Sequence, residues 1–184
     1  MITPQAQHSF DSLLMKAMAE NLVITPGDGC RIETIPANER VEESEFVVLT
    51  ISSYLFRLVV LFHFTATPET RDHFARLLRL PGKGLDDKAF YDAVSEFGNL
   101  CCGALNRDLG QSFPHVGMST PNLLKRGSMR FLATLEAGYT QVFRIEFSET
   151  LRFHATICVC EYGDLDFRWE PKALAETSGE LELF

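Results

Sequence analysis

The sequence has little positive charge and no long apolar run. Its 184 residues include 17 Lys and Arg against 25 Asp and Glu, which gives a formal net charge of -8 and a pI near 5.1. A surface with this balance repels phosphate backbones and anionic lipids, so we expect neither a nucleic acid nor a membrane as partner. The longest apolar stretch, residues 55–64, is interrupted by Arg57 and His63 and is too short to span a bilayer as a helix.

The cysteines are odd in number and poorly spaced for structural chemistry. The five cysteines are Cys30, the adjacent pair Cys101 and Cys102, and the pair Cys158 and Cys160. This pattern matches neither a zinc site nor a disulfide framework, so we predict no metal site and interpret the thiols as small buried side chains in a reducing compartment. The first residues also lack the basic region and apolar run of a signal peptide. Together these features predict a cytoplasmic protein.

Motifs that identify common enzyme classes are missing as well. The sequence contains no glycine-rich phosphate loop, no nucleophile elbow and no zinc-protease motif. Its internal histidines, at positions 63, 73, 115 and 154, have no carboxylate or cysteine at the spacing of a shared metal ligand. We therefore interpret them as ordinary strand, helix and loop residues.

Hydrophobic periodicity predicts one α+β domain over residues 1–184, with an acidic C-terminal tail from about residue 171. Turn sequences at residues 25–29 and 81–84 end the first two helices. The expected helices cover residues 4–22, 67–80 and 86–109. The expected strands cover residues 31–35, 46–51, 54–64, 129–135, 141–147 and 151–160, with an edge strand at 165–169.

The helix predicted at residues 86–109 carries two different faces when its residues are placed 100° apart. The face expected to meet the core is apolar: Phe90, Ala93, Val94, Phe97, Leu100, Cys101, Ala104 and Leu105. The opposite face follows the three- and four-residue stacking intervals of a helix surface: Asp92, Glu96, Asn99, Gly103, Asn106 and Gly110.

Several residues of this second face lower the stability of the helix. Gly103 costs about 1 kcal/mol relative to alanine in a helix interior, and it would let another chain approach the helix backbone closely. Asn99 and Asn106 are weak helix formers at positions where Lys, Glu or Gln would serve better. Such choices are typical of a functional surface, and the alternative is an exposed helix face without a role.

The residues Asp92, Glu96, Asn99 and Gly103, followed by Pro121, resemble the signature of the CheX/CheC/FliY family of chemotaxis phosphatases. The order of predicted helices and strands agrees with that family from about residue 5 to residue 160. The resemblance implies a CheC-like fold, in which a mixed or antiparallel sheet carries two long helices packed on one face.

The resemblance is nearest to CheX, which has one site per chain. CheC-like members carry the Glu and Asn motif on two helices. The first helix of this sequence has only Glu20 and Asn21 in immediate succession, which does not match. We therefore expect a single site.

For this chain the resemblance implies hydrolysis of the aspartyl phosphate of a CheY-like response regulator. Asn99 would position the attacking water, because a carboxamide accepts a hydrogen bond without carrying a charge that the phosphate repels. Glu96 would pair with a basic residue of the partner. The chain itself would bind no cofactor, since the phosphorylated partner supplies Mg²⁺. Further contacts with the partner are expected from Asp92, Gly103, Asn106 and Pro121.

Two alternatives remain open at this point. A non-catalytic CheX-like module could bind a response regulator or a flagellar-switch protein without hydrolysis, although docking alone would not need the carboxamide of Asn99. A homodimer joined through sheet edges is compatible with either function. The sequence does not identify the response regulator.

Overall fold

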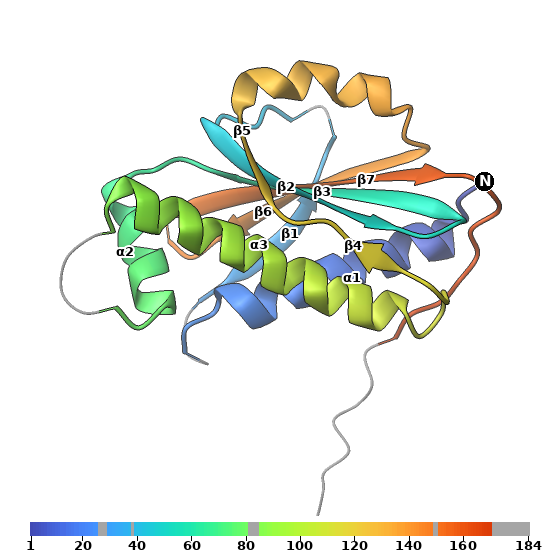
Figure 1. The fold of residues 1–184 in the computed structure, drawn as a ribbon, viewed down its shortest axis with the longest axis horizontal. Coiled ribbons are helices and arrows are strands. Elements are labelled where there is room, and N and C mark those ends of the chain that lie inside the picture. The colour runs from blue at the N-terminus through green and yellow to red at the C-terminus, as the bar shows by residue number, and fades with distance from the viewer. Residues whose placement is uncertain (26–28, 38, 81–84, 149–150, 171–184) are drawn as a thin grey trace, which may run out of the picture.

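The computed structural model describes residues 1–25, 29–37, 39–80, 85–148 and 151–170. Within these ranges a seven-stranded antiparallel sheet separates two unequal layers, as Figure 1 shows. Most of the two predicted turns and the whole acidic tail lie outside the described residues.

The sheet has the strand order β1-β6-β7-β3-β2, and two short strands, β4 and β5, both pair with the outer side of β2. Every strand pair is antiparallel. The mixed or antiparallel sheet that the sequence predicts is therefore an antiparallel one. The strands are β1 (Arg31–Ile35), β2 (Glu45–Ser52), β3 (Phe56–Phe64), β4 (Gly117–Met118), β5 (Asn122–Lys125), β6 (Tyr139–Glu146) and β7 (Arg152–Glu161).

Three α-helices form the thicker layer: α1 (Pro4–Leu22), α2 (Pro68–Leu77) and α3 (Asp87–Leu109). Each begins at a side chain that accepts a hydrogen bond from the first turn, namely Thr3, Thr67 and Asp86. The two long helices α1 and α3 pack against each other on one face of the sheet (Figure 1). This arrangement confirms the predicted fold class.

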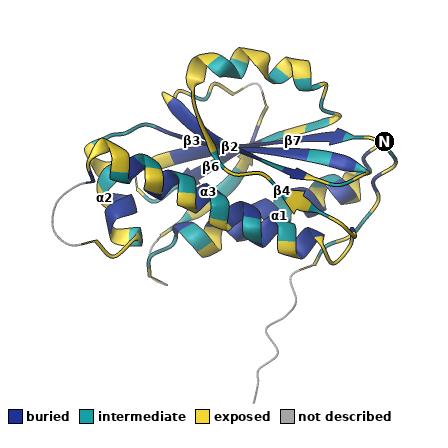
Figure 2. Cartoon of the chain, viewed as in Figure 1, coloured by how far each residue is buried: buried dark blue, intermediate teal, exposed yellow. Residues whose placement is uncertain are grey.

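The main core lies between these helices and the sheet. Phenylalanine rings fill it with edge-to-face contacts, such as Phe10 against Phe56 and Phe62 against Phe97. Strand β3 is buried along nearly its whole length, as its almost continuous apolar sequence predicts for a central strand. Figure 2 shows this contrast between the buried strands and the exposed outer helix surfaces.

The other face of the sheet is covered differently from what the sequence predicts. Residues 129–135, expected as a strand, belong instead to the 3-10 helix η1 (Arg126–Leu135). Met129, Leu132 and Leu135 recur every third residue, the repeat of a 3-10 helix, and pack on a small buried cluster that includes Phe46 and Leu61. A short apolar run with this spacing is compatible with a strand or with a 3-10 helix. The 3-10 helix forms because it covers the apolar residues on the free face of the sheet.

The expected edge strand at residues 165–169 is also wrong. Leu165 forms only an isolated bridge with Ile2, and Phe167 packs its ring against Phe10 at a centroid distance of 4.9 Å. The alternating apolar residues of this segment therefore fill the end of the core instead of extending the sheet.

Two glycines of α3 give opposite predictions for stability. At Gly98 an added Cβ would lie 2.9 Å from Leu49 Cδ1 and 3.1 Å from Val47 Cγ1, whereas at Gly103 it would meet nothing within 4 Å. Alanine gains about 1 kcal/mol of helix propensity at either position, but overpacking a core costs about 1–3 kcal/mol. We expect Gly103→Ala to raise the free energy of unfolding by about 1 kcal/mol. We expect Gly98→Ala to lower it by about the same amount.

Urea unfolding of the two variants beside the native protein measures both changes. If both variants changed the free energy of unfolding by the same amount in the same direction, the close approach of α3 to β2 at Gly98 would be contradicted.

Candidate functional site

The polar residues singled out on α3 lie along the part of the helix that faces away from the core. Asp92 and Glu96 are exposed, and Asn99, Gly103 and Asn106 are partly exposed. The polar face that the helical spacing predicts is therefore accessible to solvent. It runs along the outward side of α3, which Figure 2 shows as exposed and intermediate.

One residue of the predicted core face is not in the core. The side chain of Leu100 is 50% exposed, whereas Gly98 and Cys102 are buried. The helix is rotated about its axis relative to the expected orientation, because Gly98 permits close contact with β2 and draws that side inward. Leu100 consequently faces solvent one turn after Glu96.

The edge of the sheet that carries Pro121 borders this helix surface. Both β4 and β5 contact α3 and pair with β2. Pro121 lies between a backbone hydrogen bond from Ser119 to Thr50 and the pairing of Asn122 with Val48. Because Gly98 contacts Leu49, the neighbouring residue of β2, the turn that carries Asn99 and the segment that carries Pro121 meet the same part of the strand.

A buried carboxylate ties the helix to this edge. Glu45 is 3% exposed, accepts hydrogen bonds from the Tyr91 hydroxyl at 3.1 and 3.2 Å, and forms a salt bridge with Lys125. Burial, followed by the hydrogen bond to Glu45, raises the pKa of Tyr91. The hydrogen bond with Glu45 raises the pKa of Lys125. The sequence carries one local signal of this contact, which is an acidic residue at the start of an apolar strand.

The charges around Glu96 leave its carboxylate available. Lys88 forms a salt bridge with Asp92 at 2.9 Å, and Arg107 lies 3.7 Å from Asp108. Both cations also lie eight and eleven residues from Glu96, about 12 and 16.5 Å along the helix axis, which is too far for a salt bridge within the helix. Among the described residues, Glu96 forms no salt bridge, so its carboxylate is free to meet an external cation.

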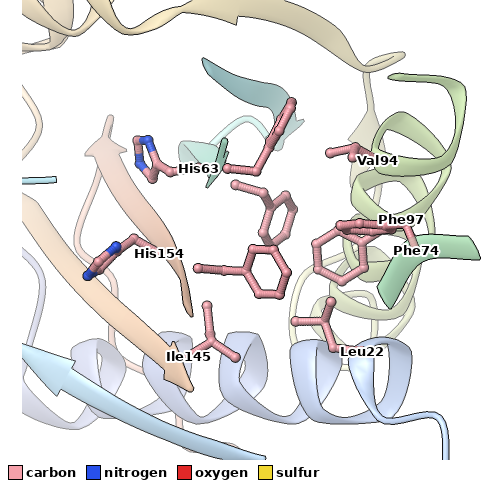
Figure 3. Close-up of a pocket in the computed structure, with 10 residues that line it drawn as sticks. Leu22, His63, Phe74, Val94, Phe97, Ile145 and His154 are labelled. Carbon is pink, nitrogen blue, oxygen red and sulfur yellow. The ribbon is translucent and has the colours of Figure 1, made fainter. Parts of the chain in front are cut away.

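The site is a surface and not a small-molecule pocket. The cavity in Figure 3 has His63 and His154 on one side and Phe74 and Phe97 on the other, but its volume of about 10 Å³ scarcely admits a single water. Two wider depressions, of about 380 and 290 Å³, are lined by charged residues of loops and strand ends, and no residue of α3 lines either. An exposed helix face suits a protein partner better than a buried ligand.

Within the described residues no cluster of ligating side chains could hold a metal ion, and no helix is long and apolar enough to cross a membrane. No disulfide joins the cysteines of the described ranges. Burial raises the pKa of Cys102 to about 12, so this side chain is an unreactive core group.

The chain resembles known proteins in its structure and not in its sequence. No family model and no curated protein sequence matches the chain. Solved structures do match. A chain of the CheX-CheY-BeF3-Mg²⁺ complex from Borrelia burgdorferi superposes with a TM-score of 0.61 at 11% identity, over 84% of this chain and 97% of that one. The chain has the CheX-like fold.

Two further CheX-like structures extend the match. Chemotaxis protein CheX from Vibrio vulnificus gives a TM-score of 0.57 at 15% identity and covers 83% of this chain and 97% of its own. FliY from Thermotoga maritima gives 0.54 at 14% identity over 85% and 90%. The similarity inferred from the α3 motif is thus confirmed for the fold, while the roles of individual residues are argued below from the chemistry of the site.

The CheX-like sheet also holds a buried polar cluster, which shares no residue with the polar face of α3. His63 bonds Thr156 at 2.9 Å, and the neighbouring His154 bonds Glu43. Two histidines interpreted as ordinary thus have partners, which the fold supplies from distant parts of the chain. Burial alone would raise the pKa of Glu43, but the hydrogen bond and charge of His154 outweigh that effect and lower it.

This cluster predicts a pH dependence of stability. Burial lowers the pKa of His63 to about 4, against 6.5 in an unfolded chain. Between these pH values the unfolded state binds a proton that the folded state does not, so the free energy of unfolding falls as the pH is lowered. The loss amounts to roughly 3 kcal/mol over the whole interval.

Urea unfolding between pH 7 and pH 4 measures the slope, and His63→Gln should flatten it. The exposed His8 provides the matched substitution, His8→Gln, which should leave the slope as in the native protein. An unchanged slope in His63→Gln would contradict the assignment to this histidine.

Proposed function

We propose that this chain hydrolyses the aspartyl phosphate of a CheY-like receiver domain that docks on the outward face of α3. The observation that carries the proposal is the Glu96 carboxylate, which forms no salt bridge within the described part of the chain, three residues before the partly exposed Asn99 on a helix that a CheX-like fold presents to solvent. The CheX structure from Borrelia burgdorferi was solved in complex with CheY, BeF3 and Mg²⁺. Receiver binding by this chain is inferred from that likeness together with the site.

The reaction needs little from the enzyme beyond position and charge. A water attacks phosphorus, the bond between phosphorus and the aspartyl oxygen breaks, and inorganic phosphate leaves with the aspartate regenerated. The receiver brings Mg²⁺ and the groups that neutralise the phosphoryl oxygens. Asn99 can accept a hydrogen bond from the water and donate another without repelling the phosphate. Its contribution is to hold the water in line with the breaking bond.

The charges on either side of Asn99 favour one orientation of the partner. Residues 109–135, which include β4, β5 and η1, contain no Asp or Glu, whereas Asp92 and Glu96 lie on the other side. A phosphoryl group meets no like charge from the β5 side. A Lys or Arg beside the phosphorylation site can meet Glu96. This arrangement supports a docked receiver whose phosphate faces Asn99.

The remaining predicted contacts fit a docking surface of this kind. Gly103 leaves open space above the helix backbone, and Pro121 borders the site at the edge of the sheet. Asp92 extends the acidic side, and Asn106 lies one turn beyond Gly103. The homodimer and the cytoplasmic location that the sequence suggests stay predictions.

Replacing Asn99 tests the catalytic role. We expect Asn99→Ala to slow the loss of phosphate from a phosphorylated receiver about 100-fold, because a misplaced water costs that much in rate. A panel of CheY-like receivers with Mg²⁺ and a small phosphodonor provides the measurement. Asn21→Ala, which removes an amide from α1, is the control and should keep the native rate.

The non-catalytic alternative predicts a different result. If the native protein binds a receiver but accelerates its dephosphorylation no more than Asn99→Ala does, the chain is a docking module and the enzymatic proposal is wrong.

Replacing Glu96 tests the docking role. We expect Glu96→Ala to weaken binding of a receiver that carries BeF3 and Mg²⁺ in place of its phosphoryl group by about tenfold, because the partner's cation is left unpaired. Titration calorimetry at two salt concentrations measures the affinity, and the native protein should show the steeper salt dependence. Asp72→Ala removes an exposed carboxylate from α2 and should change little. Equal affinities for Glu96→Ala and the native protein would rule out the ion pair.

A further inference from the structure

Two large apolar side chains flank the proposed catalytic pair without being part of it. Leu100 on α3 is 50% exposed, and Leu123 on β5 is 38% exposed. Leucine at such positions adds nothing to the solubility of an acidic protein. Neither residue belongs to the signature that suggests the function, so their placement is an independent observation.

The strand register fixes the direction of Leu123. It lies opposite Val47, and directly opposed residues of an antiparallel pair project from the same face of the sheet. Val47 belongs to the core between the sheet and the helices, so Leu123 projects toward α3. Its neighbour Leu124 lies opposite Phe46, which packs beneath η1, so Leu124 projects to the other face. Both leucines are 38% exposed.

Leu123 is level with the turn of α3 that carries the site. Val47, its partner on β2, is one of the three side chains that an added Cβ at Gly98 would meet. Asn99 follows Gly98 directly, and Glu96 lies in the same turn of the helix. The apolar side chain of β5 therefore borders the site at the level of Asn99.

Leu100 lies on the opposite border. The Sγ of Cys101 donates to the carbonyl oxygen of Ala17, so this side of α3 faces α1. At 100° per residue, the order around the helix from α1 toward β5 is Cys101, Leu100, Glu96 and Asn99. Leu123 follows on β5. The carboxylate and the amide are thus enclosed between two exposed leucines.

We propose that Leu100 and Leu123 are the two apolar contacts that seat the partner over Glu96 and Asn99. The partner is then a receiver domain with apolar side chains on both sides of the basic residue that meets Glu96. Apolar contacts around a charged centre exclude water from it, which strengthens the enclosed ion pair. This inference rests on the proposed function and adds the residues that select among receivers.

The two leucines of β5 provide a matched test. We expect Leu123→Gln and Leu100→Gln each to raise the KM for a phosphorylated receiver about five- to tenfold with kcat unchanged, since they act on docking and not on the water. Leu124→Gln is adjacent and equally exposed but faces the other side of the sheet, and it should leave KM within about twofold. Leu80→Gln, at a 47% exposed residue beyond α2, is the control for Leu100. Leu123→Met should restore the native KM.

The possible failures are distinguishable. Thermal unfolding of each variant shows whether it is folded, and the comparison of Leu123→Gln with Leu124→Gln removes any general effect on β5. If these two variants change KM equally, or neither changes it, the seating role is wrong, while a loss of activity in Asn99→Ala would still support the phosphatase. If the native protein neither dephosphorylates nor binds any receiver, the proposed function fails and this inference fails with it.

Discussion

The contact between α3 and β2 at Gly98 is the constraint on which the candidate site depends. With no side chain between them, the helix lies close enough to touch Val47 and Leu49. That contact sets the rotation of the helix about its axis, and the rotation in turn decides which residues reach solvent. Glu96 and Asn99 face outward because Gly98 faces inward. A single glycine on the buried side thus orients the chemistry on the exposed side.

Most of the fold was predictable because its elements are long and strongly patterned. The helices begin at capping residues that the sequence displays, and the central strands are nearly continuous apolar runs. The polar stripe on α3 followed from spacing alone. Its use as a site followed from two residue types, glycine and asparagine, that weaken a helix where nothing else requires them.

The features that the sequence did not predict depend on contacts between distant segments of the chain. Leu100 lies at the margin of the apolar stripe, and only the position of Gly98 against β2 decides whether it is buried. Residues 129–135 carry enough apolar character for a strand, but β2 already pairs with β5, and the remaining sheet face needs a cover. The pairing of Glu45 with Tyr91 and Lys125 joins three elements and has no local signal beyond an acidic residue at the start of an apolar strand.

Two of the polar centres of the molecule show how burial divides structural from functional groups. His63 is buried and bonded to Thr156, and the low pKa of its ring is a consequence of being enclosed. Glu96 is exposed and has no salt bridge among the described residues. A buried group of the first kind contributes to stability and to its dependence on pH. An exposed group such as Glu96 contributes free energy only when a partner binds to it.

The buried carboxylate of Glu45 has a consequence for the kinetics of recognition. By holding Tyr91 of α3 and Lys125 of β5 together, it fixes the β5 side of the proposed docking surface in the free protein. A partner that docks as proposed would meet a β5 edge already held against α3, and its association rate would be governed by diffusion and charge. Receivers that differ in fit would arrive at similar rates and differ in how long they stay. Discrimination among them would lie in residence time.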